Sequence, residues 1–164
     1  MHRAYDVGTY PIAPGKLDGT EEWAKQAAHY SGGALWNNGT FVNRDIRGKP
    51  GQVSNHARGV AIDLSYRFMP NSRKGVTDGR RLSLQFMNTV IRHADTLGLC
   101  LAIDYWPEPF GRSWKCDRAT WQKAIRPTFT GAPKGDWWHV EITLELARSP
   151  EKVRRAFAAV FTTV

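Results

Sequence analysis

Cysteine is scarce in this sequence: Cys100 and Cys116 are the only two, and there is no CxxC pair. A metal site made of thiolates needs closely spaced cysteines, so a site of that type is not expected. We interpret both residues as reduced, partly buried thiols, in preference to a cysteine nucleophile. Whether they form a disulfide stays open, because that depends on the distance between their Cα atoms.

Long hydrophobic runs are also missing. No apolar stretch approaches the roughly 20 residues that span a bilayer, and none follows the first six residues. Neither membrane insertion nor a secretory signal is therefore predicted. The chain also lacks repeats, low-complexity tracts and interdomain linkers, so we expect one domain over residues 1–164, synthesised in a cytoplasm. The chain stops abruptly at Val164, shortly after its last expected helix, and we therefore expect a domain excised from a longer protein.

Acidic residues are fewer than basic ones: the chain has 15 Asp and Glu and 23 Lys and Arg, which gives a formal net charge of +8. A positive excess favours polyanionic partners such as nucleic acid, acidic lipid or an anionic cell wall. The basic residues are spread along the chain and match no nucleic-acid-binding motif, so a specific nucleic-acid partner is not predicted. Hydrophobic residues make up 41% of the chain, which is typical of a globular domain.

Hydrophobic periodicity and turn residues predict a mixture of helices and strands. Thr20 and Ser149 are expected helix N-caps. The expected helices cover residues 20–30, 81–97 and 150–161, with one or two helical turns at 119–125; the expected strands cover 59–64, 99–105 and 137–146; loops or turns are expected at 44–52, 70–79 and 107–111. The strands are too few for a doubly wound sheet. We predict an α+β domain with a small antiparallel sheet flanked by helices.

The first candidate motif runs from Ser54 to Asp63 and reads SNHARGVAID. His56 is expected on a turn, and Asp63 lies on the strand that follows. Gly59 and Ala61 share the Asp63 face of that strand, so the face is free of bulky side chains. A neutral imidazole and a carboxylate are good zinc ligands.

The second candidate motif is DWWHVE, from Asp136 to Glu141. On a strand, Trp137, His139 and Glu141 share one face, and the alternate residues face a core. Three protein ligands with an open fourth position form a catalytic zinc site. Taken singly, each residue has an ordinary explanation: a loop histidine at 56, an arginine-paired carboxylate at 63 and a core histidine at 139. Taken together they form a specific pattern.

The two motifs resemble those of a family of zinc peptidases. This family contains D-alanyl-D-alanine carboxypeptidases and dipeptidases, and the L-alanyl-D-glutamate endolysins of bacteriophages. It carries Ser-x-His-x-x-Gly-x-Ala-x-Asp followed by acid-x-x-His, and both patterns are present here in register. The resemblance covers about residues 43–145. It implies a hedgehog/D-Ala-D-Ala peptidase-like fold with a zinc site on the sheet.

The resemblance also implies roles for individual residues. His56, Asp63 and His139 would be the zinc ligands, and Asp136 the general base that activates water. Many relatives have Glu at that position, and phage endolysins accept Asp; Glu141 is the rival base. Strand alternation would turn Asp136 away from His139, so this role requires a bend, which residues 133–135 could supply.

Substrate contacts are predicted around these ligands. Ser54 is expected to hydrogen-bond near the site or to orient His56. An arginine is expected to hold the scissile carbonyl or a substrate carboxylate, since guanidinium pairs bidentately with such groups. The candidates are Arg44, Arg47 and Arg58. The tryptophans at 106, 114 and 137 could line a cleft. Of these we predict Trp137 as a substrate contact.

The resulting prediction is a zinc-dependent peptidoglycan peptidase that cuts a stem-peptide bond, as the catalytic domain of a phage endolysin. Its partner would be bacterial peptidoglycan, reached after release from the host cytoplasm, and the chain is expected to be monomeric. L-Ala–D-Glu, D-Ala–D-Ala and cross-bridge bonds all stay open as substrates. The alternatives are a zinc-bearing, non-catalytic cell-wall binding module and, on charge alone, a nucleic-acid-binding domain.

Overall fold

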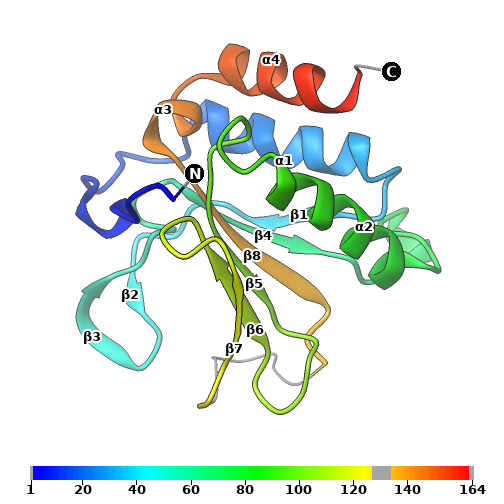
Figure 1. The fold of residues 1–164 in the computed structure, drawn as a ribbon, viewed down its shortest axis with the longest axis horizontal. Coiled ribbons are helices and arrows are strands. Elements are labelled where there is room, and N and C mark those ends of the chain that lie inside the picture. Colours follow the sequence, from blue (N-terminus) through cyan, green and yellow to red (C-terminus); the bar gives the residue numbers. More distant parts are fainter. Residues whose placement is uncertain (1, 127–133, 163–164) are drawn as a thin grey trace.

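A computed structural model describes residues 2–126 and 134–162 and shows an α+β domain built on one antiparallel sheet (Figure 1). The order of the six strands is β1-β4-β8-β5-β6-β7, and every neighbouring pair is antiparallel. Their bounds are β1 Trp36–Gly39, β4 Ala61–Ser65, β5 Leu99–Asp104, β6 Arg112–Lys115, β7 Trp121–Lys123 and β8 Trp137–Ile142. The predicted coarse fold class is therefore confirmed.

Helices pack against one face of the sheet (Figure 1). They are α1 Asp18–Tyr30, α2 Gly79–Arg92, α3 Leu144–Ala147 and α4 Pro150–Phe161, with 3-10 turns η1 Val7–Thr9 and η2 Pro70–Ser72. The core lies between them and the sheet: Trp23 and Phe157 meet edge to face, and Trp138 of β8 donates to the hydroxyl of Ser83 on α2. No helix in the described part of the chain is long and apolar enough to cross a membrane.

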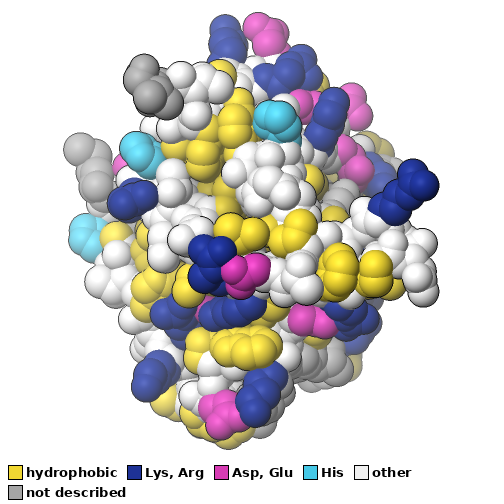
Figure 2. Space-filling model, turned by 90° about the vertical axis from the view of Figure 1, so that its right-hand side faces the viewer, with side chains coloured by type: hydrophobic (Ala, Val, Ile, Leu, Met, Phe, Trp, Pro, Cys, Tyr) yellow, Lys and Arg dark blue, Asp and Glu magenta, His cyan; other side chains and the backbone are white. Residues whose placement is uncertain are grey.

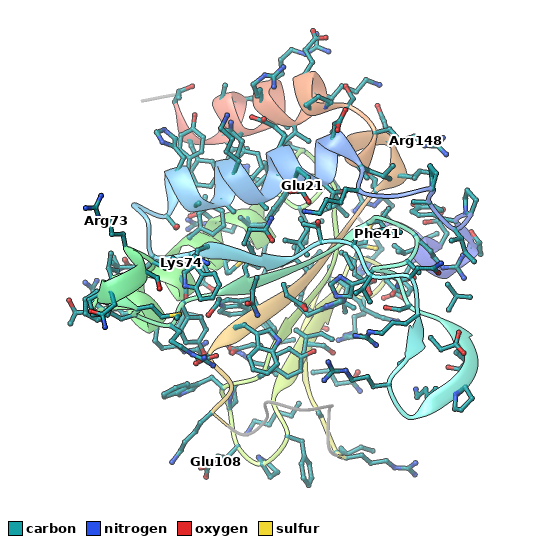
Figure 3. The ribbon with its side chains drawn as sticks, turned by 180° about the vertical axis from the view of Figure 1, so that it is seen from behind. Glu21, Phe41, Arg73, Lys74, Glu108 and Arg148 are labelled. Atoms are coloured by element: carbon teal, nitrogen blue, oxygen red, sulfur yellow. The ribbon has the colours of Figure 1, made fainter. Side chains whose placement is uncertain are left out.

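The side chains of strand β8 alternate between the core and the opposite face of the sheet. Trp138 and Val140 are fully buried against the helices. Trp137 and His139 alternate with them and are only partly buried, on the side that the helices leave open. In Figure 3 the domain is seen from behind, and the labelled Glu108 marks the end of the sheet farthest from α1 and α4. The predicted alternation of this strand is confirmed.

Local signals located most elements correctly. The strands β4, β5 and β8 and the helices α1, α2 and α4 lie where they were predicted, although α2 ends at Arg92 and β8 at Ile142. Ser149 caps α4 as expected, since its Oγ accepts from the backbone N–H of Lys152 at 3.2 Å. Thr20 is not an N-cap: α1 begins earlier, and the Thr20 hydroxyl donates to the carbonyl of Gly59 at 2.5 Å.

Besides the strand predicted to run to residue 146, of which residues 144–146 instead belong to helix α3, two predictions of secondary structure were wrong. Residues 44–52 were expected to be a loop, but the chain forms a two-stranded hairpin, β2 Asp45–Ile46 and β3 Lys49–Val53. Its turn includes Gly48 with φ of 73°, a conformation that favours glycine. Residues 119–125 were expected to be helical, but they contain β7, in which Trp121 pairs with Trp114 of β6. In both places strand pairing within the folded chain overrides the local composition.

Candidate metal centre

Sheet pairing brings the two sequence motifs together. Strands β4 and β8 are antiparallel neighbours, and their register places Asp63 directly opposite His139. His56 lies on the turn before β4, where the N–H of Gly59 donates to its carbonyl at 3.0 Å. Gly59 has φ of 73°, and a Cβ atom there would come within 2.8 Å of Leu17, so glycine lets this turn lie close to the preceding segment.

Three potential ligand atoms converge at this point. His56, Asp63 and His139 each offer one, and these atoms lie within 4.8 Å of one another. The Oδ1 atom of Asp63 is 3.4 Å from Nε2 of His56 and 3.0 Å from Nδ1 of His139. The two imidazole planes meet at 68°. Two imidazole nitrogens and one carboxylate oxygen are a donor set that suits zinc.

The other nitrogen of each imidazole has a protein neighbour. His56 Nδ1 lies 3.3 Å from the carbonyl oxygen of Thr40, and His139 Nε2 lies 3.0 Å from Oε1 of Glu141. Histidine ligands of metals commonly donate their second N–H to a carbonyl or carboxylate, which fixes the tautomer and the ring orientation. Both rings are thus oriented as a metal site requires, and the residues fit a zinc ion.

Electrostatics favour a cation at this position. Burial alone would lower the pKa of His139, but hydrogen bonds with Asp63 and Glu141 outweigh it and raise this pKa to about 10. Burial alone would raise the pKa of Asp63, but hydrogen bonds with both histidines outweigh it and lower this pKa. Without metal, the site therefore holds a proton on His139 between two carboxylates at neutral pH, and a metal cation could take the place of that proton.

Glu141 is the most fully hydrogen-bonded acid of the site. Its side chain is almost entirely buried, at 5% exposure. Oε2 accepts from the Tyr5 hydroxyl at 2.6 Å, and Oε1 accepts from the Asn55 amide at 2.8 Å in addition to its contact with His139. Burial and the adjacent Glu141 raise the pKa of Tyr5, so the phenol stays a donor.

A cavity of about 390 Å³ opens beside the three potential ligands. It contains four of the predicted substrate contacts, Arg44, Arg47, Ser54 and Trp137. The structure also brings residues that the sequence did not indicate, namely Asn38, Ile46, Asn55, Arg67, Ile103 and Tyr105, to the lining. Hairpin β2–β3 therefore contributes to the site.

Not every residue proposed to contact substrate is placed to do so. Arg58 is not among the described residues that line the cavity, and its guanidinium donates to the carbonyl of Tyr10. Ser54 acts locally, because its Oγ accepts from the N–H of His56 at 3.3 Å. Trp114 is buried in the core, while Trp106 is 40% exposed and absent from the described lining.

Asp136 is engaged by an arginine. Its carboxylate forms a two-pronged ion pair with Arg67, with Nε–Oδ2 at 2.5 Å and Nη2–Oδ1 at 3.1 Å. Arg67 lines the cavity, whereas Asp136 is not among the lining residues that the structure describes. The chain bends at Lys134 and Asp136, and Lys134 has a left-handed φ of 60°. Of the three residues proposed to supply the bend, 133 lies outside the described residues.

Sequence reasoning missed Tyr5, Asn55 and Arg67. Asn55 could have been noticed, because it directly precedes the ligand candidate His56. Tyr5 and Arg67 carry no local signal, and only the folded chain brings them to the site. No family model, curated protein or solved structure matches the chain. The case for a function therefore rests on the motifs and on this geometry.

Proposed function

We propose that the chain is a zinc-dependent peptidoglycan peptidase that hydrolyses a stem-peptide bond, as the catalytic domain of a phage endolysin with a hedgehog/D-Ala-D-Ala peptidase-like fold. One observation carries the proposal: two motifs 76 residues apart meet at His56, Asp63 and His139 beside a cavity. The sequence alone predicts each of these three residues as a ligand. Their convergence supports a common ligand.

The three residues would hold zinc through His56 Nε2, Asp63 Oδ1 and His139 Nδ1, the atoms that face one another. Bound zinc acidifies a coordinated water and polarises a carbonyl. The protein supplies the orientation: Thr40 and Glu141 lie next to the outward nitrogens of the two rings. The cavity beside this site leaves space for a peptide on the open side.

Asp136 is our proposed general base. The rival, Glu141, already accepts from Tyr5 and Asn55 and contacts His139, so its oxygens have little capacity left for the proton of a water. Among the described residues, the side chain of Asp136 is held by Arg67, which lines the cavity. A carboxylate of an incoming peptide could compete for this guanidinium and release Asp136, since arginine pairs bidentately with carboxylates in general.

The lining of the cavity supports an anionic peptide as substrate. Arg44, Arg47 and Arg67 reach it from three places in the chain, and Trp137 adds an apolar surface. The acidic residues among the described lining are Asp63 and Glu141, both committed to the histidines. Stem peptides of peptidoglycan carry free carboxylates, which these arginines could bind.

The space-filling view is also compatible with an anionic wall as partner. Figure 2 shows Lys and Arg side chains distributed over the visible face, with acidic side chains among them. A formal net charge of +8 attracts a polyanion without a concentrated patch. A specific nucleic-acid surface would be expected to gather the basic residues on one face.

A zinc-bearing, non-catalytic cell-wall binding module is the second candidate. The ion pair of Asp136 with Arg67 favours it, because both carboxylate oxygens of Asp136 are already engaged by the guanidinium. In this alternative the metal would order the site, and the arginines would bind wall peptides without cleavage.

Purified peptidoglycan separates the two candidates. The zinc-loaded peptidase should release soluble fragments and new amino groups, and a chelator should abolish both. Mass spectrometry of the fragments identifies the bond that is cut. Binding to the wall without any new amino group would support the binding module, and the absence of both binding and cleavage would refute both proposals.

A further inference from the structure

The Glu141 carboxylate is a junction between three segments that are distant in the sequence. It contacts His139 on its own strand, Asn55 on the turn before β4 and Tyr5 near the N-terminus, 136 residues away. Asn55 Nδ2 also lies 3.4 Å from the Tyr5 oxygen, so the three polar groups form one cluster.

We propose that Tyr5 and Asn55 are positioning residues of the metal centre. They hold the Glu141 carboxylate where it accepts the Nε2–H of His139, so that Nδ1 of the same ring faces the cation. This inference rests on the proposed zinc site, but it does not depend on peptidase activity. It assigns a function to the N-terminal segment, which neither sequence motif includes.

The geometry of the carboxylate explains why two external donors matter. A glutamate has three side-chain torsions, so a contact with His139 alone would leave its orientation free. The Tyr5 hydroxyl fixes Oε2 at 2.6 Å and the Asn55 amide fixes Oε1 at 2.8 Å, which together define the plane of the carboxylate. Outer residues of this kind orient metal ligands and raise their affinity for metal.

Asn55 also couples the two ligand histidines. It directly precedes His56 in the chain, and its side chain reaches the acid that orients His139. Its carbonyl accepts from the N–H of Val60 at 3.2 Å, which ties the turn to the start of β4. A displacement of the turn would therefore disturb both imidazoles, and the Asn55 amide restrains their separation.

Tyr5 is itself held in place by its surroundings. The ammonium of Lys115 lies 3.9 Å from the centre of its ring, and the nearby N–H of Arg3 donates to the carbonyl of Cys116 at 3.1 Å. These contacts attach the N-terminal segment to the end of β6. The phenol is thus presented to Glu141 by a fixed segment, as a positioning role requires.

The test is the zinc dissociation constant of Tyr5→Phe, measured by competition with a chromophoric chelator. Tyr10→Phe is the matched control, because it removes a tyrosine–aspartate hydrogen bond of 2.9 Å from the same segment, away from the cluster. We expect zinc binding to weaken about 10- to 100-fold in Tyr5→Phe, as is typical for outer-shell residues, and to stay within about twofold of wild type in Tyr10→Phe. Asn55→Ala should weaken binding in the same way as Tyr5→Phe.

A second readout reports the ring of His139 directly. In zinc-loaded wild type and in Tyr10→Phe, the Nε2–H proton of His139 should give a slowly exchanging NMR signal, and in Tyr5→Phe this proton should exchange faster. Wild-type zinc affinity and slow exchange in Tyr5→Phe would overturn the inference, as would an equal loss of affinity in both variants. A wild type that binds no zinc would refute the metal centre itself, whereas tight zinc binding without hydrolysis would refute only the peptidase.

Discussion

Replacing Glu141 by glutamine separates orientation of the metal ligand from catalysis. The carboxylate is buried and surrounded by three hydrogen-bonding groups, Tyr5, Asn55 and His139. Glutamine keeps one acceptor oxygen and turns the other position into a donor, which leaves at least one buried donor without an acceptor. Such a loss costs about 1–3 kcal/mol, which corresponds to roughly one to two decades in a binding constant.

We therefore expect Glu141→Gln to weaken zinc binding about 10- to 100-fold, while the variant keeps most of its hydrolytic rate at saturating zinc. The assay is a chelator competition followed by hydrolysis of peptidoglycan at several zinc concentrations. Glu145→Gln is the matched control, because Glu145 is exposed and pairs with Lys152 at the surface. An inactive Glu141→Gln with wild-type zinc affinity would refute this reasoning and identify Glu141 as the general base.

Three further predictions test the base, the proton balance and the packing. Asp136→Asn should keep zinc but slow hydrolysis about 10²- to 10⁴-fold; unchanged hydrolysis with zinc bound would exclude Asp136 as the base. Because the metal-free protein holds a proton on His139, whose pKa is raised to about 10, zinc must displace that proton. The apparent zinc affinity should therefore rise about tenfold for each unit by which the pH increases, until the pH reaches that pKa. A zinc affinity that does not depend on pH in a competition titration would contradict this prediction. Gly19→Ala should lower the thermal unfolding temperature, because its Cβ would overlap the carbonyl of Leu146, whereas Gly8→Ala meets nothing within 4 Å; equal unfolding temperatures would argue against this helix packing.

The potential ligands could be predicted because they belong to local patterns. Alternation along residues 137–142 placed His139 on the face opposite the buried Trp138, and the strand around Asp63 was clear from its apolar neighbours. Their convergence could not be derived from periodicity, since the Asp63–His139 pairing depends on which strands become neighbours. The family resemblance, which rests on the spacing within each motif, supplied that step.

The surroundings of the site could not be predicted, and the reason is physical. Tyr5 reaches Glu141 across 136 residues, and Arg67 reaches Asp136 across 69. Neither contact can therefore be inferred from a local pattern in the sequence. Hairpin β2–β3 was missed because its glycines and proline are typical of a loop, while the strand pairing around them depends on the fold. Arg58 was one of three arginine candidates for substrate binding, but its side chain turns toward the carbonyl of Tyr10.

The most direct test of the account is a crystal of the zinc-loaded protein measured at the zinc absorption edge. We predict one anomalous peak per chain, about 2.0–2.1 Å from Nε2 of His56 and Nδ1 of His139, and about 2.0–2.2 Å from a carboxylate oxygen of Asp63. Glu141 and Asp136 should lie outside the coordination sphere. A fully folded protein with no peak at these three residues, or with its zinc bound elsewhere, would contradict the central claim.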